Sequence, residues 1–381
     1  MLHRLRIPFL LTVVALIGAG CGSSSSQKSG ANTAKRGPWC QAQPDKAWRD
    51  ALAGGLVSLS RKASIEPLAD AGDGHSFYAE LSSKDYSGIV RVDASTSRYT
   101  KIQPIARPAM FRAIGAVDGR WFVWVGMWRN ATSGPDYSRW EIWSWDSGSE
   151  RLRKLAAEPN AARTGNWFSG SRLSARDGYV LFVHAEGRET VLEAADLASG
   201  RSKTVSRGKL VSPLFLLPKH VAVWEELDET GDRKKAKIAA ADVTTGKRVP
   251  LPQALRAIDA NNASDLTSAG AALLYSRLFP QSLWWTPSLD LAPRRVVAGV
   301  SSFEFENSLN VSGDYALFSD QPKVYLANGK DGRYLRIASD ASALLGDRAL
   351  IVVKEPTDVL QTHTDVSFLP LASLPAIPPC R

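Results

Sequence analysis

Two pairs of glutamates lie close together in the sequence, and one of them has a spacing that acid–base chemistry uses. Glu225 and Glu226 are adjacent in this chain of 381 residues, and Glu304 and Glu306 are separated by one residue. On a β-strand, Glu304 and Glu306 would share one face, as the carboxylates of a general acid–base pair can. Solvated strands carry the same pattern, and we expect both pairs to be exposed strand residues.

Other common catalytic motifs are absent from the sequence. It contains no Gly-x-Ser-x-Gly nucleophile elbow, no phosphate-binding Gly-x4-Gly-Lys-Ser/Thr loop and no His-Glu-x-x-His. Beyond residue 20 the chain has four widely spaced histidines, which we expect to be structural: His75, His184, His220 and His363. The acidic segment Leu227–Asp232 lacks the alternating oxygen ligands of an EF-hand loop. The sequence therefore predicts no metal site, no cofactor and no catalytic residue.

Tryptophan is concentrated in one stretch of the chain. Residues 121–145 hold half of the twelve tryptophans, namely Trp121, Trp124, Trp128, Trp140, Trp143 and Trp145. Strand alternation places Trp124 on the face opposite Trp121. In the return strand, Trp143 and Trp145 share the face opposite Trp140. We predict that most of these rings pack in the core between neighbouring sheets.

The loop between these two strands, Gly126–Arg139, has a different composition. It carries Trp128, Arg129 and Tyr137. Trp167 lies in another loop. Aromatic rings on a loop beside an Arg can stack on a sugar ring or a peptide side chain, and binding residues often lie on loops of a rigid scaffold. We therefore take Trp128, Arg129, Tyr137 and Trp167 as candidate ligand-binding residues.

A turn signal that recurs six times defines the elements that would hold these residues. It has an Asp or Asn, a few small residues that usually include Gly, and then a basic residue before a short strand. The copies begin at Asp93, Asp146, Asp196, Asp242, Asp290 and Asn328, of which the copy at Asp290 is degenerate. Successive copies are 53, 50, 46, 48 and 38 residues apart. A period of about 45 to 50 residues matches a unit of four strands.

A second signal, a turn followed by an apolar strand, occurs seven times. The turns are Asp73-Gly74, Asp118-Gly119, Asp177-Gly178, Lys219-His220, Ala269-Gly270, Gly313-Asp314 and Gly346-Asp347. The strands that follow are rich in Val, Tyr, Phe and Trp, which suit a pleated and partly buried surface. One such sheet cannot bury both faces, whereas radial repetition buries them and leaves only short edges.

We therefore predict an all-β fold, a β-propeller of four-stranded blades. Seven blades fit best, closed by an N-terminal strand near Val57–Leu59, and rings of six or eight blades are the alternatives. A short helix is predicted at Pro44–Gly54, because Pro lies near its start and Gly at its end. The pattern resembles the bacterial TolB-like and WD40-like propeller repeats over about residues 56–375, although the Gly-His and Trp-Asp signature of WD40 repeats is absent.

The N-terminus has the parts of a secretory signal: a basic start that includes Arg4 and Arg6, the apolar run Ile7–Ile17, and small residues before Cys21. The position of that Cys makes the segment resemble a bacterial lipoprotein signal, which implies cleavage before Cys21 and lipid attachment, such as palmitate, to its thiol. The apolar run is shorter than the ~20 residues of a spanning helix. An uncleaved anchor is the alternative.

This interpretation divides the chain into three parts. Residues 1–20 are the signal peptide, residues 21–38 a flexible Gly/Ser-rich tether, and residues 39–381 the propeller domain. The protein is then exported and lipid-anchored to the bacterial cell membrane, facing outward. The composition of the tether predicts a flexible spacer, because its small polar residues cannot bury enough apolar surface to fold.

With Cys21 assigned to the lipid, Cys40 and Cys380 remain. An even pair of cysteines in a secreted chain favours a disulfide. Free thiols and pairing with another chain are the alternatives. Because the two cysteines flank the repeat region, a bond between them would clasp the ring near the junction of its first and last blades.

The chain is basic, with 47 Lys and Arg against 38 Asp and Glu, a formal net charge of +9. Cleavage before Cys21 removes Arg4 and Arg6 and no acid, which leaves 45 basic residues and a charge of about +7. The excess is spread over a large surface. It suits an anionic membrane surface and does not indicate nucleic-acid binding.

The leading functional prediction is a non-enzymatic binding or scaffolding module for an envelope protein or glycan partner. It rests on fold analogy and on the missing catalytic motifs. The alternative is an envelope hydrolase or lyase that acts on glycans or peptides at the channel mouth. Convergent carboxylates or a bound metal would favour the enzyme. A smooth, uncharged channel with an exposed aromatic patch would favour the binding module.

Overall fold

The structure is a computed structural model that divides the chain into two units, Met1–Arg36 and Gly37–Arg381. Only the second unit contains residues that the structure describes. These are residues 38–59, 63–105, 111–128, 139–157, 173–186, 189–208, 210–227, 236–277, 280–298, 309–320, 322–354 and 364–380.

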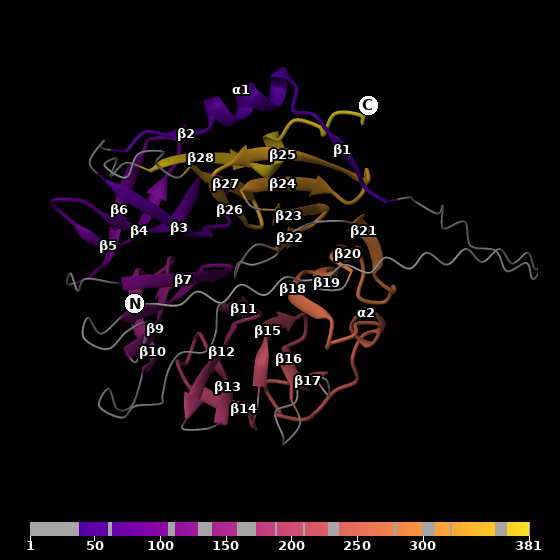
Figure 1. Cartoon of the computed structure of the whole chain (residues 1–381). Helices are drawn as coiled ribbons and strands as arrows, with labels where there is room; N and C mark the ends of the chain where they lie inside the picture. The colour runs from indigo at the N-terminus through magenta and orange to yellow at the C-terminus, as the bar shows by residue number, and fades with distance from the viewer. Residues whose placement is uncertain are drawn as a thin grey trace, which may run out of the picture. The chain divides into compact units, whose positions relative to one another are not determined.

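Seven sheets, each built from antiparallel hairpins, form a seven-bladed β-propeller, as the repeat predicts (Figure 1). Blade 1 contains β3 (Ser64–Asp70), β4 (Ser76–Ser82), β5 (Ser87–Asp93) and β6 (Arg98–Pro104). Blade 2 contains β7 (Phe111–Asp118), β8 (Trp121–Trp128), β9 (Arg139–Asp146) and β10 (Arg151–Ala157). Blade 3 contains β11 (Ser174–Arg176), β12 (Tyr179–Glu186), β13 (Glu189–Asp196) and β14 (Ser202–Gly208).

The second half of the ring continues the pattern. Blade 4 contains β15 (Leu210–Leu217), β16 (Val221–Glu226) and β17 (Lys237–Asp242), and a single bridge between Ala241 and Arg248 stands for its fourth strand. Blade 5 contains β18 (Ala263–Ala269), β19 (Ala272–Arg277), β20 (Ser282–Thr286) and β21 (Arg294–Ala298). Blade 6 contains β22 (Asn310–Ser312), β23 (Tyr315–Asp320), β24 (Lys323–Asn328) and β25 (Arg333–Ser339). Blade 7 contains β26 (Ala341–Leu345), β27 (Ala349–Lys354) and β28 (Asp365–Pro370).

Both turn signals lie where the strands reverse at one face of the ring. The turns of the second signal join the first and second strands of each blade, and Gly119 and Gly178 adopt φ of 57° and 82°, a region that L side chains avoid. The Asp turns join the third and fourth strands. Asp242 is typical, because its Oδ1 accepts hydrogen bonds from the N–H groups of Thr244 and Thr245, both at 2.8 Å. We call this side the hairpin face, and the opposite side the connection face.

The core consists of apolar layers between successive blades. Tyr78 of blade 1 stacks on Phe122 of blade 2, with ring centroids 4.0 Å apart. Trp124 and Trp145 belong to the same layer. Trp140 points to the other side of blade 2 and packs against blade 3. The predicted alternation of the tryptophans and their role in the core are therefore confirmed.

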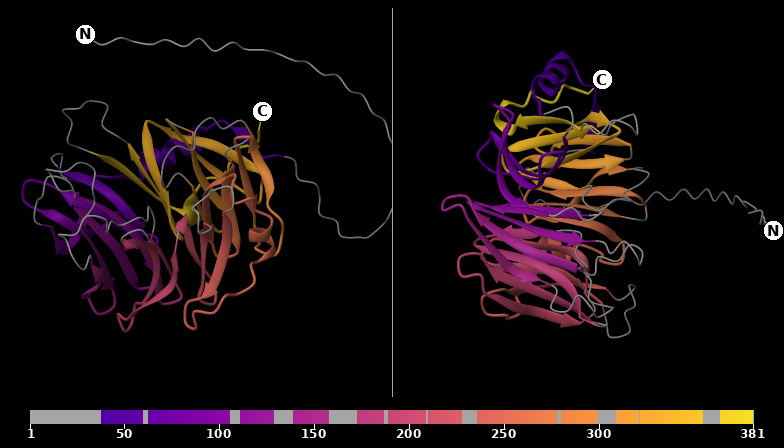
Figure 2. Two further views of the ribbon diagram at one scale, coloured as in Figure 1. Left: turned by 60° about the horizontal axis from the view of Figure 1, so that its bottom comes forward. Right: turned by 90° about the vertical axis from the view of Figure 1, so that its left-hand side faces the viewer.

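The N-terminal segment completes the ring. β2 (Leu56–Val57) pairs with β28 and becomes the outer strand of blade 7, close to the predicted closing strand. β1 (Cys40–Ala42) pairs in parallel with β25 and adds a fifth strand to blade 6. Figure 2 shows this indigo segment beside the yellow C-terminal strands.

The predicted helix is α1 (Lys46–Gly54), which lies between these two strands of the N-terminal segment. Asp45 caps it by accepting a hydrogen bond from the N–H of Trp48, and Gly55 closes it with a bond to the carbonyl of Ala51. Trp48 is fully buried against blades 6 and 7, and its indole N–H donates to the carbonyl of Ala376. The short helices α2 (Gln253–Arg256) and η2 (Leu371–Ser373) lie in connections.

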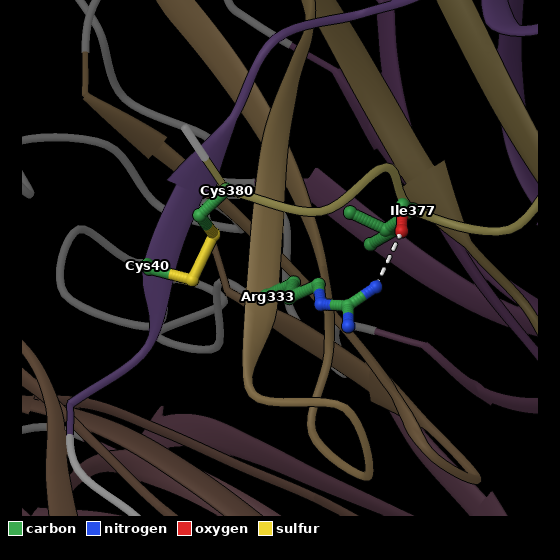
Figure 3. Close-up of a disulfide and its surroundings, with 4 residues drawn as sticks. All are labelled: Cys40, Arg333, Ile377 and Cys380. Carbon is green, nitrogen blue, oxygen red and sulfur yellow. Dashed lines mark hydrogen bonds between the residues drawn. A yellow bond between two sulfur atoms is a disulfide. The ribbon is translucent and has the colours of Figure 1, made fainter.

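Cys40 and Cys380 form a disulfide with their Cα atoms 6.1 Å apart (Figure 3). The bond joins β1 to the C-terminal tail, and Arg333 donates a further hydrogen bond to the tail at Ile377, 3.2 Å. The predicted position at the junction of blades 1 and 7 is wrong. The bond lies at blade 6, because the N-terminal segment first pairs with β25 and reaches blade 7 only after α1.

In the part of the chain that the structure describes, no helix has both the length and the hydrophobicity needed to cross a membrane.

Candidate functional site

The first strands of the seven blades surround a central channel with a volume of about 860 Å³. This volume lies in the usual range for ligand pockets. Small residues such as Ala113, Gly115 and Ala175 line much of its wall. Its described charged lining residues are Glu66, Asp70, Asp118, Arg176, Asp340 and Asp347. The channel is therefore neither smooth nor uncharged.

At the hairpin face, the lining residue Asp70 holds two blades together. Its Oδ2 accepts hydrogen bonds from the N–H groups of Arg348 and Ala349 in blade 7, at 2.7 and 3.1 Å, and its Oδ1 accepts one from Gly72, at 3.1 Å. Burial raises the pKa of Asp70, although these backbone bonds act in the opposite direction. A Cβ at Gly346 would collide with the Asp70 side chain, so the contact requires glycine there.

Asp118 has a similar structural role at the same face. Its Oδ2 accepts a hydrogen bond of 2.6 Å from the N–H of Gly178 in blade 3. Arg176, the only described base of the lining, points a guanidinium nitrogen at the carbonyl of Leu216 in blade 4, at 3.5 Å. The charged residues at this end therefore join neighbouring blades.

Toward the connection face, one carboxylate of the channel wall, Glu66, belongs to a carboxylate pair. Glu66 in β3 lies directly opposite Glu80 in β4 in the antiparallel register. Directly opposed residues share one face of the sheet and have Cβ atoms about 4.5 to 5.5 Å apart. Glu66 is exposed and lines the channel, whereas Glu80 is half-buried behind it.

Local sequence explains why Glu80 is withdrawn from water. Its neighbours Ala79 and Leu81 are buried toward blade 7, and its own face of β4 carries Tyr78, which packs on blade 2. One oxygen of Glu80, Oε2, is buried and has no hydrogen-bond partner within the described structure. Burial, and after it the charge of Glu66, raises the pKa of Glu80 to about 8.

The pair therefore has the two properties that acid–base chemistry needs. Near neutral pH Glu80 largely keeps its proton, while the exposed Glu66 is its carboxylate neighbour. Two carboxyl groups whose surroundings push their pKa values apart can serve as general acid and general base. A perturbed carboxyl at a cleft is also a common mark of a functional site.

A third carboxylate lies at the same end of the channel. Asp340 is exposed, immediately precedes β26 of blade 7 and adopts a φ of 52°. Its N–H donates to the carbonyl of Pro322, 2.9 Å away. Since β26 contacts β3, Asp340 and Glu66 belong to neighbouring inner strands.

The candidate residues of the aromatic loop are mostly not described. Trp128 is the last residue of β8, and its side chain is not described. Arg129, Tyr137 and Trp167 lie outside the described residues, as do Glu304 and Glu306. The prediction of a ligand-binding aromatic loop therefore stays a prediction.

The structure bears on two further expectations about single residues. Glu225 is only 6% exposed, so the expectation that it is a solvated strand residue is wrong: it lies on the face of β16 that packs on blade 5. His184 is buried between the rings of Trp140 and Phe182, at centroid distances of 5.4 and 6.3 Å, in agreement with a structural role.

Glu66 and Glu80 are the residues that sequence reasoning missed. They are 14 positions apart, and only the strand register brings them together. A usable signal was the strand Ser76–Ser82, in which Glu80 is the one charged residue among apolar neighbours. Within the described ranges, no group of three or more His, Cys, Asp or Glu is arranged to hold a metal ion.

Comparisons with known proteins agree on the fold. No protein-family model and no curated protein matches the chain. Among solved structures, an oligogalacturonate lyase in complex with manganese is similar with a TM-score of 0.54 at 13% identity, over 82% of this chain and 91% of that one. An oligogalacturonate lyase from Vibrio parahaemolyticus gives 0.50 at 8% identity, over 82% and 90%. These likenesses show a seven-bladed propeller. The resemblance to TolB-like repeats stays a prediction at the level of family.

Proposed function

We propose that the chain is an envelope enzyme, a lyase or hydrolase that cleaves glycans at the mouth of the propeller channel on the connection face. The observation that carries the proposal is the pairing of Glu66, which lines a channel of about 860 Å³, with Glu80, which is half-buried behind it. Convergent carboxylates are the feature that separates the enzyme from the non-enzymatic binding module.

The fold comparison supports the same class. The two solved structures with TM-scores of 0.54 and 0.50 are named as lyases of an oligosaccharide. Their names show that a propeller of this architecture can cleave a glycan. At 13% and 8% identity they do not carry a substrate or a residue role to this chain.

The pair supplies both proton transfers of glycosidic bond cleavage. Glu80 donates its proton to the glycosidic oxygen while the C–O bond breaks and its electron pair stays on that oxygen. Glu66 accepts a proton, from a ring carbon in an elimination or from the attacking water in a hydrolysis. In an elimination the C–H electron pair becomes the new C=C bond. In both cases the atoms balance without an oxidant or reductant.

One of the two named lyases binds manganese, and the described residues of this chain do not fit such a site. No cluster of three metal-binding side chains occurs among them, and the described histidines His75, His184 and His220 lie on separate blades or turns. We therefore assign both proton transfers to Glu66 and Glu80 and propose no metal-dependent step.

The proposed location is the outer side of a bacterial cell membrane, with a lipid on Cys21. The disulfide between Cys40 and Cys380 supports it, because such bonds persist in oxidising compartments. We expect Cys21→Ser to release the full-length protein from the membrane fraction. Unchanged fractionation would contradict lipid anchoring.

The proposal is tested by incubating the mature protein with a panel of defined oligosaccharides. New reducing ends report either reaction, and ultraviolet absorbance of an unsaturated product identifies elimination of a uronate. We expect Glu80→Gln and Glu66→Gln each to lower kcat by about 10² to 10⁴-fold, the usual contribution of a general acid or base. Glu150→Gln, on the hairpin face, is the matched control and should keep full activity.

Three outcomes would overturn the proposal. They are full activity in both folded variants, no cleavage of any oligosaccharide by the wild type, and binding without turnover. Binding without turnover would favour a non-enzymatic binding module.

A further inference from the structure

Lysine and arginine are concentrated on the outer edge of the propeller. In blades 1, 2, 3 and 5 the first strand lines the channel and the fourth strand is outermost. We define the rim as the outermost segments of blades 1 to 5, residues 98–104, 151–157, 201–208, 247–248 and 294–298. The rim contains twelve bases and no Asp or Glu. The remaining strands of the ring contain more acids than bases, so the basic excess of the chain is unevenly distributed.

Four bases of the rim recur at one position in four successive blades. Each follows the Asp of its blade's turn by five residues, and all are exposed: Arg98, Arg151, Arg201 and Lys247. In blades 1 and 2 the base lies directly opposite that Asp in the strand register. In blades 3 and 4 the carbonyl of the base accepts a hydrogen bond from the N–H of the Asp. We call these four residues the turn bases.

The turn bases have no carboxylate partner in the described structure, although an Asp lies close to each. The carboxylate of that Asp is used within its own turn: Oδ1 of Asp93 accepts hydrogen bonds from the N–H groups of Ser95 and Thr96, at 2.9 and 3.0 Å. The Asp242 turn is built in the same way. The ion pairs of the described residues involve other bases. The four turn bases are therefore exposed and free to contact an anion.

Several other bases of the rim have structural roles. Three form ion pairs with glutamates of their own blades, Lys154 with Glu141, Arg207 with Glu186 and Arg248 with Glu226. Arg153 and Lys203 each donate a hydrogen bond to a backbone carbonyl of the next blade, at 2.8 and 2.9 Å. Such contacts explain part of the basic composition of the rim, but none of them involves a turn base.

The arrangement of the turn bases limits the shape of a partner. The blades radiate from the channel, so the outer edges of successive blades face different directions (Figure 2). A planar surface such as a bilayer meets only neighbouring blades, whereas a flexible chain can follow the rim from blade 1 to blade 4. A single exposed charge pair contributes little. A chain that contacts several bases binds more tightly, because each further contact is intramolecular.

From this geometry we infer that the rim binds a linear acidic polysaccharide, whose successive anionic groups contact the turn bases of several blades. The inference goes beyond the proposed cleavage reaction and uses none of the channel residues. The choice of a polysaccharide over a nucleic acid rests on the proposed location outside the cytoplasm, which the disulfide between Cys40 and Cys380 supports.

The test measures binding of the mature protein to heparin, a linear acidic polysaccharide, by calorimetry. A heparin tetrasaccharide is compared with a heparin fragment long enough to reach across several blades, and neutral dextran of the same length is the uncharged control. We expect the long fragment to bind most tightly, the tetrasaccharide more weakly and dextran not at all. Affinity for the long fragment should fall as salt rises, because the contacts are exposed charge pairs.

Replacement of the turn bases by Gln tests their role directly. We expect Arg98→Gln and Lys247→Gln each to weaken binding of the long fragment by about two- to fivefold, the effect of one exposed charge pair. Because the turn bases lie on different blades, their effects should multiply to about 10- to 10³-fold in the variant that lacks all four. The matched control for the double variant is Lys46→Gln with Lys323→Gln, which removes two exposed bases outside the rim and should bind like the wild type.

The inference is overturned if the wild type does not bind heparin, if the variant lacking all four turn bases binds like the wild type, or if the control variant loses as much affinity as its counterpart. Equal affinity for the tetrasaccharide and the long fragment would also contradict it. Tighter binding to phosphatidylglycerol vesicles or to duplex DNA would assign the rim to a membrane or a nucleic acid instead.

Cleavage of the oligosaccharide panel is measured in parallel and separates the two proposals. We expect the variant lacking all four turn bases to lose heparin binding and to retain cleavage. A wild type that binds heparin through the turn bases but cleaves no oligosaccharide would overturn the proposed function and leave the inference standing.

Discussion

The two ends of the channel use the same residue types for different purposes. At the hairpin face, Asp70 and Asp118 each accept hydrogen bonds from the backbone of a neighbouring blade. At the connection face, Glu80 has a buried oxygen without a partner in the described structure, and Glu66 faces the channel. Carboxylates whose oxygens accept hydrogen bonds stabilise a fold. A carboxyl that is buried without such a partner lowers the stability of the fold, a cost that is typical of functional sites.

The largest expected effect on stability comes from Asp70→Ala at the hairpin face. The change leaves the N–H groups of Arg348 and Ala349, the latter buried, without their acceptor and removes the link between blades 1 and 7. We expect the free energy of unfolding to fall by about 2 to 4 kcal/mol. Urea unfolding at pH 7 measures it. If Asp70→Ala lowers the free energy of unfolding by less than Asp340→Asn does, Asp70 does not have a structural role.

Glu80→Gln should raise the free energy of unfolding at high pH, whereas Asp70→Ala should lower it. Because folding raises the pKa of Glu80 from 4.5 to about 8, the folded state favours the protonated form. The contribution of Glu80 to the stability of the wild type should therefore be most favourable below pH 4.5 and decline as pH rises from there to about 8. Gln removes that loss, and we expect the variant to be more stable than the wild type by about 1 to 3 kcal/mol at pH 8.5, discounted for partial exposure.

The measurement for Glu80→Gln is the free energy of unfolding of both proteins from pH 4 to pH 9. The two curves should converge at acidic pH and separate progressively toward alkaline pH. Parallel curves over the whole range would contradict the account, because they would mean that Glu80 ionises as easily in the folded protein as in the unfolded chain.

Asp118→Ala should have a smaller effect than Asp70→Ala. Asp118 accepts an inter-blade hydrogen bond from Gly178 and is less buried than Asp70. We expect a loss of about 1 to 2 kcal/mol in urea unfolding with unchanged cleavage activity of the folded protein. A loss of activity with no loss of stability would show that the hairpin face also has a functional carboxylate. It would contradict the distinction between structural carboxylates at that face and functional ones at the connection face.

The smallest effect on stability is expected for Asp340→Asn at the connection face. Its side chain is exposed, and its left-handed φ of 52° also suits Asn. We expect a change in the free energy of unfolding of no more than about 0.5 kcal/mol. A loss comparable to that of Asp70→Ala would show that this carboxylate, too, holds the ring together.

Local sequence patterns were enough to predict the ring. The turn at Asp118-Gly119 and the Asp242 turn are built from residues within four positions of one another, and both form where predicted. The helix at Lys46–Gly54 and the Cys40–Cys380 bond also follow from local or compositional signals. The repeat period of about 45 to 50 residues gave the ring its expected four strands per blade.

The candidate site depended on information that is not local. Glu66 and Glu80 meet only because β3 and β4 pair in one register, which includes a bulge between Pro67 and Ala69. The prediction of an aromatic binding loop at Trp128 stays a prediction, because the side chain of Trp128 is not described. The disulfide was placed one blade away from its true position, since the parallel pairing of β1 with β25 has no sequence signal.

Direct titration of the Glu80 carboxyl tests the central claim without knowledge of the substrate. With isotope-labelled glutamate, the carboxyl resonance of Glu80 can be assigned by comparison with Glu80→Gln and followed from pH 3 to pH 10. We predict a pKa of about 8 in the wild type, and a lower value in Glu66→Gln, because the neutral amide removes the charge that helps to raise it. A Glu80 pKa near its usual 4.5, or one that does not respond to Glu66→Gln, would contradict the assignment of this pair as the acid and base of the channel.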